Sequence, residues 1–188
     1  MGSLSFAGGI MSPLPSKGGE LCNKWYNGKL AGYQFWGKKA SDAEVIECVK
    51  KVGINFQDLY GSTPINSAAS YAHVDISRLK LLRSLGADIN IPSDTGSTPL
   101  GRAAAGSSNP AVIFYLLLEG ADISSQEKRN DVLNALIRND FGLWENEDLR
   151  IALGGPDNIE LSEDDVGRFV YPVNGKIIRK YVKNKTDG

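Results

Sequence analysis

The pattern of apolar and polar positions repeats itself in the central part of the chain, from Gly61 to Asp122. The tetrad Gly-Ser-Thr-Pro begins at Gly61 and begins again at Gly96, and an Ala-Ala pair follows each copy. A Gly-Ala-Asp triplet then closes each copy, at Gly86 and at Gly120. Self-similarity at a spacing of about 35 residues indicates an array of stacked repeats.

Each copy predicts a pair of helices. The Thr-Pro dipeptide is a helix start, because Thr is a good N-cap and Pro is favoured at the first helical position. The glycine of each Gly-Ala-Asp triplet stands where a helix ends and a left-handed residue is needed. The second copy contains apolar residues at helical spacing that predict one apolar face: Val112, Ile113, Leu116 and Leu117. Such a unit cannot bury its apolar face alone, so the units are expected to stack.

This pattern of Gly-x-Thr-Pro, Ala-Ala, an apolar helix and Gly-Ala-Asp closely resembles the ankyrin repeat, over about residues 41–139. Two departures are visible: Asn66 and Gly101 stand where the family usually has His, and the first full copy carries two extra residues around Tyr71. The resemblance implies an all-α solenoid of about three to four stacked helix pairs. Degenerate copies are expected before Gly61 and after Asp122.

The chain before the repeats divides into two parts. Residues 1–20 are rich in Gly, Ser and Pro and are expected to be a flexible lead, either disordered or the remnant of a signal sequence. The array is expected to span residues 21–140. Its beginning contains a dense aromatic group that predicts an N-terminal cap over the first repeat: Trp25, Tyr26, Tyr33, Phe35 and Trp36. Ser41 then begins a helix, because Glu44 completes a capping box.

Residues 141–188 are expected to form a C-terminal capping extension. A last helix is predicted near residues 146–153, and an acidic run at Glu160–Asp165 is interpreted as a solvated loop. Asn174-Gly175 lies inside a segment rich in β-branched and aromatic residues, which predicts a two-residue β-hairpin.

Composition excludes some classes of partner. The chain has 188 residues with 21 basic and 22 acidic side chains, so its formal charge is −1. This balance argues against nonspecific binding to nucleic acid. No run of 18 apolar residues is present, so no membrane span is expected.

Cys22 and Cys48 are the two cysteines of the chain. They are either reduced buried thiols, which suits a cytoplasmic protein, or partners in one disulfide. The segment around them resembles the entry region of bacterial exported ankyrin proteins. That resemblance implies a Cys22–Cys48 disulfide and a periplasmic or secreted protein. Two cysteines and His73 do not make four zinc ligands, so neither a metal nor a cofactor is expected.

Catalytic residues are not predicted. His73 is the one histidine, and we interpret it as a hydrogen-bonding residue across the turn between two helices, because no nucleophile motif surrounds it. No Gly-rich phosphate loop is present either. We therefore expect a protein that is not an enzyme, the less favoured alternative being an active site near Glu163–Arg168.

The resemblance implies a scaffold that binds another protein. In the family, contacts usually come from the turn tips and the first helices. On this chain those positions are Leu59, Tyr60, Ser62, Ser70, Tyr71, Asp94, Thr95, Ser97 and Ala105. Tyr71 has a second interpretation, in which its ring fills the space made by the inserted residues. A narrower hypothesis is an extracytoplasmic immunity protein that neutralises a bacterial toxin or effector.

Overall fold

The computed structural model describes residues 20–153, and all regular elements in this range are helical. The predicted flexible lead, the acidic run, the Asn174-Gly175 hairpin and the alternative active site near Glu163–Arg168 lie outside the described residues. The helices follow one another along the chain as α1 (Glu20–Tyr26), α2 (Gly32–Gln34), the π-helix η1 (Phe35–Lys39), α3 (Asp42–Val52), α4 (Pro64–Ala69), α5 (Ile76–Ser84), α6 (Pro99–Gly106), α7 (Pro110–Leu118), α8 (Gln126–Ile137), the 3₁₀ helix η2 (Leu143–Glu145) and α9 (Glu147–Ala152).

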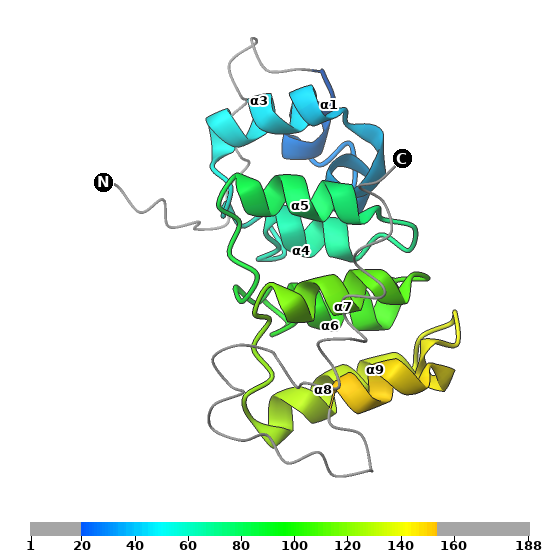
Figure 1. The fold of residues 1–188 in the computed structure, drawn as a ribbon. Coiled ribbons are helices and arrows are strands. Elements are labelled where there is room, and N and C mark those ends of the chain that lie inside the picture. The colour runs from blue at the N-terminus through cyan, green and yellow to red at the C-terminus, as the bar shows by residue number, and fades with distance from the viewer. Residues whose placement is uncertain (1–19, 154–188) are drawn as a thin grey trace.

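The described helices form four stacked pairs, which confirms the predicted all-α repeat solenoid. Figure 1 shows the pairs as layers, from α3 at one end to α8 and α9 at the other. The first helices of the pairs pack on one another in the order α4, α6, α8, and the second helices in the order α5, α7, α9. The short helices α2 and η1 pack on α4 and thus begin the row of first helices. The aromatic segment is therefore not a separate layer above the array, because it supplies the first helix of the first unit.

The local signals in the sequence explain where the helices begin and end. Ser41 caps α3 in a complete capping box with Glu44, and the hydrogen bonds from Ser41 lower the pKa of that carboxyl. Thr63 and Thr98 cap α4 and α6 through their hydroxyl oxygens, each at 3.3 Å from the backbone nitrogen three residues later. All three predicted helix starts are confirmed.

Two glycines close the second helices of the predicted copies. Gly86 and Gly120 have φ angles of 93° and 92°, in the left-handed region. Residues other than glycine rarely adopt this backbone conformation. The Gly-Ala-Asp triplets therefore mark where the chain turns from one unit to the next.

Helix α7 differs from the prediction. Its residues from Ala111 to Leu117 are all buried, whereas the sequence predicted a single apolar face. The reason is that α7 packs against α6 of its own unit and against the helices α5 and α9 of its two neighbours. Burial also raises the pKa of the Tyr115 hydroxyl on this helix.

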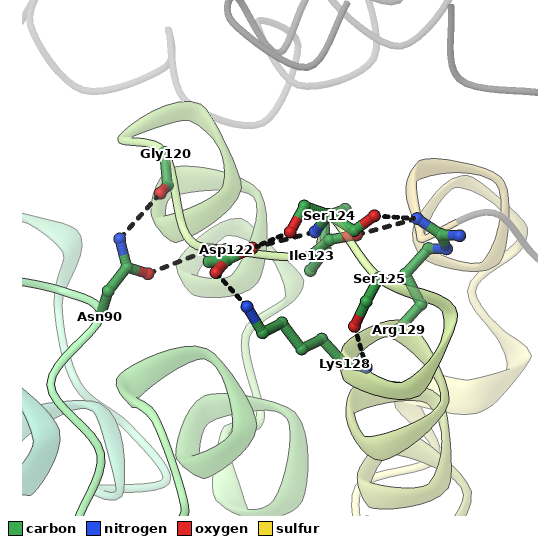
Figure 2. Close-up of polar contacts among 8 residues, drawn as sticks. All are labelled: Asn90, Gly120, Asp122, Ile123, Ser124, Ser125, Lys128 and Arg129. Carbon is green, nitrogen blue, oxygen red and sulfur yellow. Dashed lines mark hydrogen bonds and ion pairs between the residues drawn. The ribbon is translucent and has the colours of Figure 1, made fainter. Parts of the chain in front are cut away.

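Asparagine side chains join successive units along one edge of the array. Asn55 accepts a hydrogen bond from the backbone nitrogen of Asp88 at 2.9 Å. Asn90 does the same for Asp122 one unit later, also at 2.9 Å, as Figure 2 shows. The bonds join residues about one repeat apart, so they fix the spacing between units.

The N-terminal helices are held to the array by a covalent bond and by an arginine. A disulfide joins Cys22 of α1 to Cys48 of α3, with Cα atoms 5.7 Å apart, as the resemblance implied. Arg78 of α5 donates to the carbonyl oxygen of Trp36 at 3.1 Å and to that of Ala40 at 2.5 Å. Burial lowers the pKa of this guanidinium, and the nearby Asp42 carboxylate partly opposes that shift.

In the described range, no helix combines the length and the apolar character needed to cross a membrane.

Candidate functional site

A groove with a volume of about 560 Å³ opens where the N-terminal helices meet the turns that precede α4 and α6. We call it the turn-tip groove. One wall is the end of α1 with the following loop and α2, including Trp25, Tyr26 and Tyr33. We call the lining residues from the two turns the facing wall, and those from α4 and α6 the base. The groove is thus built from three successive units of the fold.

The first turn is held in shape by its own aspartate. Asp58 Oδ1 accepts hydrogen bonds from the backbone nitrogens of Tyr60 at 2.9 Å and Ser62 at 3.0 Å. The backbone nitrogen of Asp58 donates to the carbonyl oxygen of Ser62 at 3.0 Å. This turn presents two large side chains to solvent, because Leu59 is 63% exposed and Tyr60 is 74% exposed.

The second turn is tied to the first. The backbone nitrogen of Asp94 donates to the carbonyl oxygen of Tyr60 at 3.0 Å. The Gln57 side chain donates to the carbonyl oxygens of both Gly61 and Pro92, at 2.7 and 3.1 Å. Since main-chain atoms of both turns take part in these bonds, the two tips form one continuous edge.

The opposite wall is aromatic. Trp25 packs edge-on to Phe56 with ring centres 6.0 Å apart, and Tyr26 lies 6.0 Å from the same ring. On its other side Trp25 stacks on Phe35 at 5.8 Å. Trp25 is held three residues after Cys22, so the disulfide anchors the helix that carries this wall.

Two polar side chains at the base have hydrogen-bonding capacity left over. Asn66 donates to the carbonyl oxygen of Ser97 at 2.9 Å, but its buried Oδ1 has no partner in the described chain. Arg102 donates to the hydroxyl of Ser93 at 3.3 Å. Asn66 occupies the position where the family usually has His, and here it joins α4 to the next turn.

The structure brings most of the predicted partner-binding residues together. Those that line the turn-tip groove are Leu59, Tyr60, Ser62, Ser70, Asp94 and Thr95. Ser97 and Ala105 do not line it. Tyr71 does not line it either: its ring is half-buried and stacks on Tyr33 at 6.4 Å. This packing is consistent with the second interpretation, in which the Tyr71 ring fills the space made by the inserted residues.

The sequence does not place Arg102 at a site. The density of aromatic residues between Trp25 and Trp36 predicts a packing role first and makes this segment only a secondary candidate for binding. The sequence contains nothing that marks Arg102 as a site residue, because a single arginine in the first helix of a repeat is common.

His73 forms a different contact from the one predicted. Its Nδ1 lies 2.9 Å from the hydroxyl oxygen of Ser108, a residue of the next unit. The histidine therefore links two units at their turns and does not bridge the turn of its own unit. Within residues 20–153, no group of three or more His, Cys, Asp or Glu residues is placed to hold a metal ion.

Comparison with known families agrees with this architecture. A family model described as "Ankyrin repeats (3 copies)" matches residues 38–127. A comparison with curated proteins found no match. The matched range begins in η1 and ends in the first turn of α8, so it includes both turns of the groove. Residues 38–127 of the chain therefore contain ankyrin repeats.

Proposed function

We propose that this protein is a non-catalytic scaffold that binds a partner protein through the turn-tip groove. Ankyrin repeats are generally protein–protein interaction modules. The observation that carries the proposal for this site is the exposure of Tyr60 and Leu59 on a turn whose backbone is fixed by Asp58. A large exposed side chain on a rigid turn loses little freedom on binding, and exposed tyrosines are common interface anchors.

The proposal is tested by capturing the partner with the full chain and then measuring its affinity for variants. Tyr60→Ala should weaken binding about thirtyfold, the effect of losing a typical aromatic anchor. Folding should be unaffected, because the Tyr60 side chain is mostly in solvent. Phe141→Ala is the matched control, since Phe141 is 48% exposed and does not line the groove.

Further variants show whether the turn-tip groove is the binding site. If Tyr60→Ala and Leu59→Ala both fold and bind as the unmodified chain does, the turn-tip groove is not the binding site. Tyr71→Ala is expected to behave differently, because its ring packs between Tyr33 and the array. It should lower the free energy of unfolding and affect binding only through that loss.

A narrower form of the proposal is an immunity protein that neutralises a toxin in the periplasm or outside the cell. The Cys22–Cys48 disulfide supports an oxidising compartment, where such bonds persist. Cells that produce the chain with a neighbouring toxin should survive, and cells with the Tyr60→Ala variant should not. If cells survive equally well with the unmodified chain and with the Tyr60→Ala variant, toxin neutralisation does not depend on the groove.

A further inference from the structure

We infer that the turn-tip groove receives an arginine side chain, presented by an extended segment of the partner protein. This inference rests on the proposed function and names the chemistry of the partner at that site. It follows from three properties of the groove: two carboxylates that form no ion pair with any described residue, an aromatic wall, and a guanidinium at the base.

The carboxylates are those of Asp58 and Asp94, one from each turn. Neither forms an ion pair with any residue between 20 and 153, although Asp122 and Glu119 elsewhere in the array do. The Asp58 carboxylate is held by two backbone hydrogen bonds, whereas at Asp94 the backbone is held, by the bond from its own nitrogen to Tyr60. Two negative charges, that of Asp58 fixed by its hydrogen bonds, are therefore available to a cation that enters between the turns.

The aromatic wall favours a flat cation. Trp25 is buried and packs with Tyr26 against Phe56, so the rings open to a ligand at the groove are those of Tyr33 and Tyr60, which are 43% and 74% exposed. A guanidinium stacks on aromatic faces and can at the same time form paired hydrogen bonds with a carboxylate. An ammonium is a compact point charge that can lie over a ring but lacks the planar fork that forms paired hydrogen bonds with a carboxylate. The groove thus suits arginine better than lysine.

Arg102 explains why the arginine should come from an extended segment. Its guanidinium has five N–H donors, and among the described residues its one hydrogen bond goes to Ser93. A partner that brings only positive charge would leave these donors without an acceptor and would be repelled by them. An extended peptide supplies main-chain carbonyl oxygens beside its side chain, so it satisfies Arg102 while its arginine faces the two aspartates.

The test uses the full chain with its disulfide intact and a phage-displayed library of random peptides. Selected peptides should be enriched in arginine. A labelled copy of one selected peptide is then measured by fluorescence polarisation. Replacing its arginine with glutamine should weaken binding about tenfold or more, and replacing it with lysine should weaken it less.

Variants of the protein identify the groove as the site. Asp94→Asn should weaken binding of the selected peptide about fivefold, because it removes one of the two charges without changing size. Asp131→Asn is the matched control: this exposed aspartate of α8 undergoes the same change in charge away from the groove. Asp58→Asn is a second test, with circular dichroism to show that the turn still forms.

The inference is overturned if no peptide is selected, if selected peptides are acidic or neutral, or if Asp94→Asn binds them as the unmodified chain does. Its failure is distinguishable from failure of the proposed function. If the selected peptides are neutral but bind the Tyr60→Ala variant more weakly, the groove is still a binding site and only the preference for arginine is wrong. If a natural partner binds the Tyr60→Ala variant as tightly as the unmodified chain, the groove is not the binding site.

Discussion

Asn90 is hydrogen-bonded to the backbone of the next unit on both sides of Ala121. Its Oδ1 accepts from the nitrogen of Asp122 at 2.9 Å, and its Nδ2 donates to the carbonyl oxygen of Gly120 at 3.2 Å (Figure 2). One side chain thereby satisfies a donor and an acceptor at the end of α7, in the segment where the chain turns toward α8. Both bonds are formed between units and neither is formed within one.

Asn90→Ala should therefore destabilise the array by about 1–2 kcal/mol, the usual range for losing two hydrogen bonds in a partly exposed setting. Urea denaturation gives the free energy of unfolding. Asn134→Ala is the control, because Asn134 is exposed on α8 and alanine is the better helix former there. Equal stability of the two variants would mean that water replaces the Asn90 bonds without cost.

Asp122 predicts a dependence of stability on pH. The ion pair with Lys128 and the hydrogen bonds from Ser124 lower its pKa from 3.8 to about 2 (Figure 2). The folded state therefore holds the carboxylate charged at a pH where the unfolded chain already binds a proton. Its contribution to stability is complete above about pH 4 and is lost as the pH falls from there toward 2.

Asp122→Asn isolates this contribution, because the other carboxyls titrate in both proteins. The unmodified chain should be more stable than the variant at pH 5, by less than about 1 kcal/mol since solvent screens this partly exposed pair. The difference should shrink as the pH is lowered to about 2. A difference that stays constant over that range would show that the charge of Asp122 is not what stabilises this turn.

The fold was predictable because its signals are local. A Thr-Pro start, the capping box at Ser41 and a glycine with positive φ each act within a few residues, and they recur at a fixed spacing. The full burial of α7 and the contact between His73 and Ser108 were not predictable in the same way. Both depend on which neighbouring unit lies alongside, and that is set by stacking.

The candidate site was predictable only in part. The resemblance predicts Tyr60 because turn tips are exposed in this architecture, and the structure places its side chain in solvent at the groove. Tyr71 was named on the same grounds, but the packing of Tyr33 against it depends on a segment about 40 residues earlier. The aromatic wall depends on tertiary packing in the same way, since Trp25 and Phe56 meet only after α1 is joined to α3.

The disulfide should stabilise the chain measurably. Cys22 and Cys48 are 26 residues apart and both are buried. Closing a loop of that length lowers the entropy of the unfolded chain enough to stabilise the fold by about 3–4 kcal/mol. Urea denaturation with and without a reductant measures this difference, and intact-mass spectrometry counts the thiols.

The double variant Cys22→Ser, Cys48→Ser distinguishes the effect of breaking the disulfide from any other effect of the reductant. Its unfolding should not respond to the reductant, whereas that of the unmodified chain should. If the oxidised and reduced chains unfold at the same urea concentration, the packing of Trp25 alone holds α1 in place.

Replacing glycine with alanine is expected to have opposite effects on stability at Gly37 and at Gly101. A Cβ atom at Gly37 in η1 would lie 2.7 Å from the Cβ of Tyr71, closer than such atoms approach in proteins. At Gly101 in α6 the nearest atom would be the hydroxyl oxygen of Ser97 at 3.4 Å, an ordinary contact. Gly37 is therefore a point of close packing between the N-terminal helices and the array, and Gly101 is a helical glycine with room for a methyl group.

Gly37→Ala should destabilise the chain by about 1–3 kcal/mol, because η1 must move away from Tyr71. Gly101→Ala should stabilise it by about 0.5–1 kcal/mol, because alanine has less freedom to lose in a helix. Thermal and urea unfolding of both variants give the two signs. The displacement of η1 should also disturb the stacking of Tyr33 on Tyr71, which near-ultraviolet circular dichroism detects. If Gly37→Ala is as stable as Gly101→Ala, η1 can shift freely on α4 and does not fix the aromatic wall of the groove.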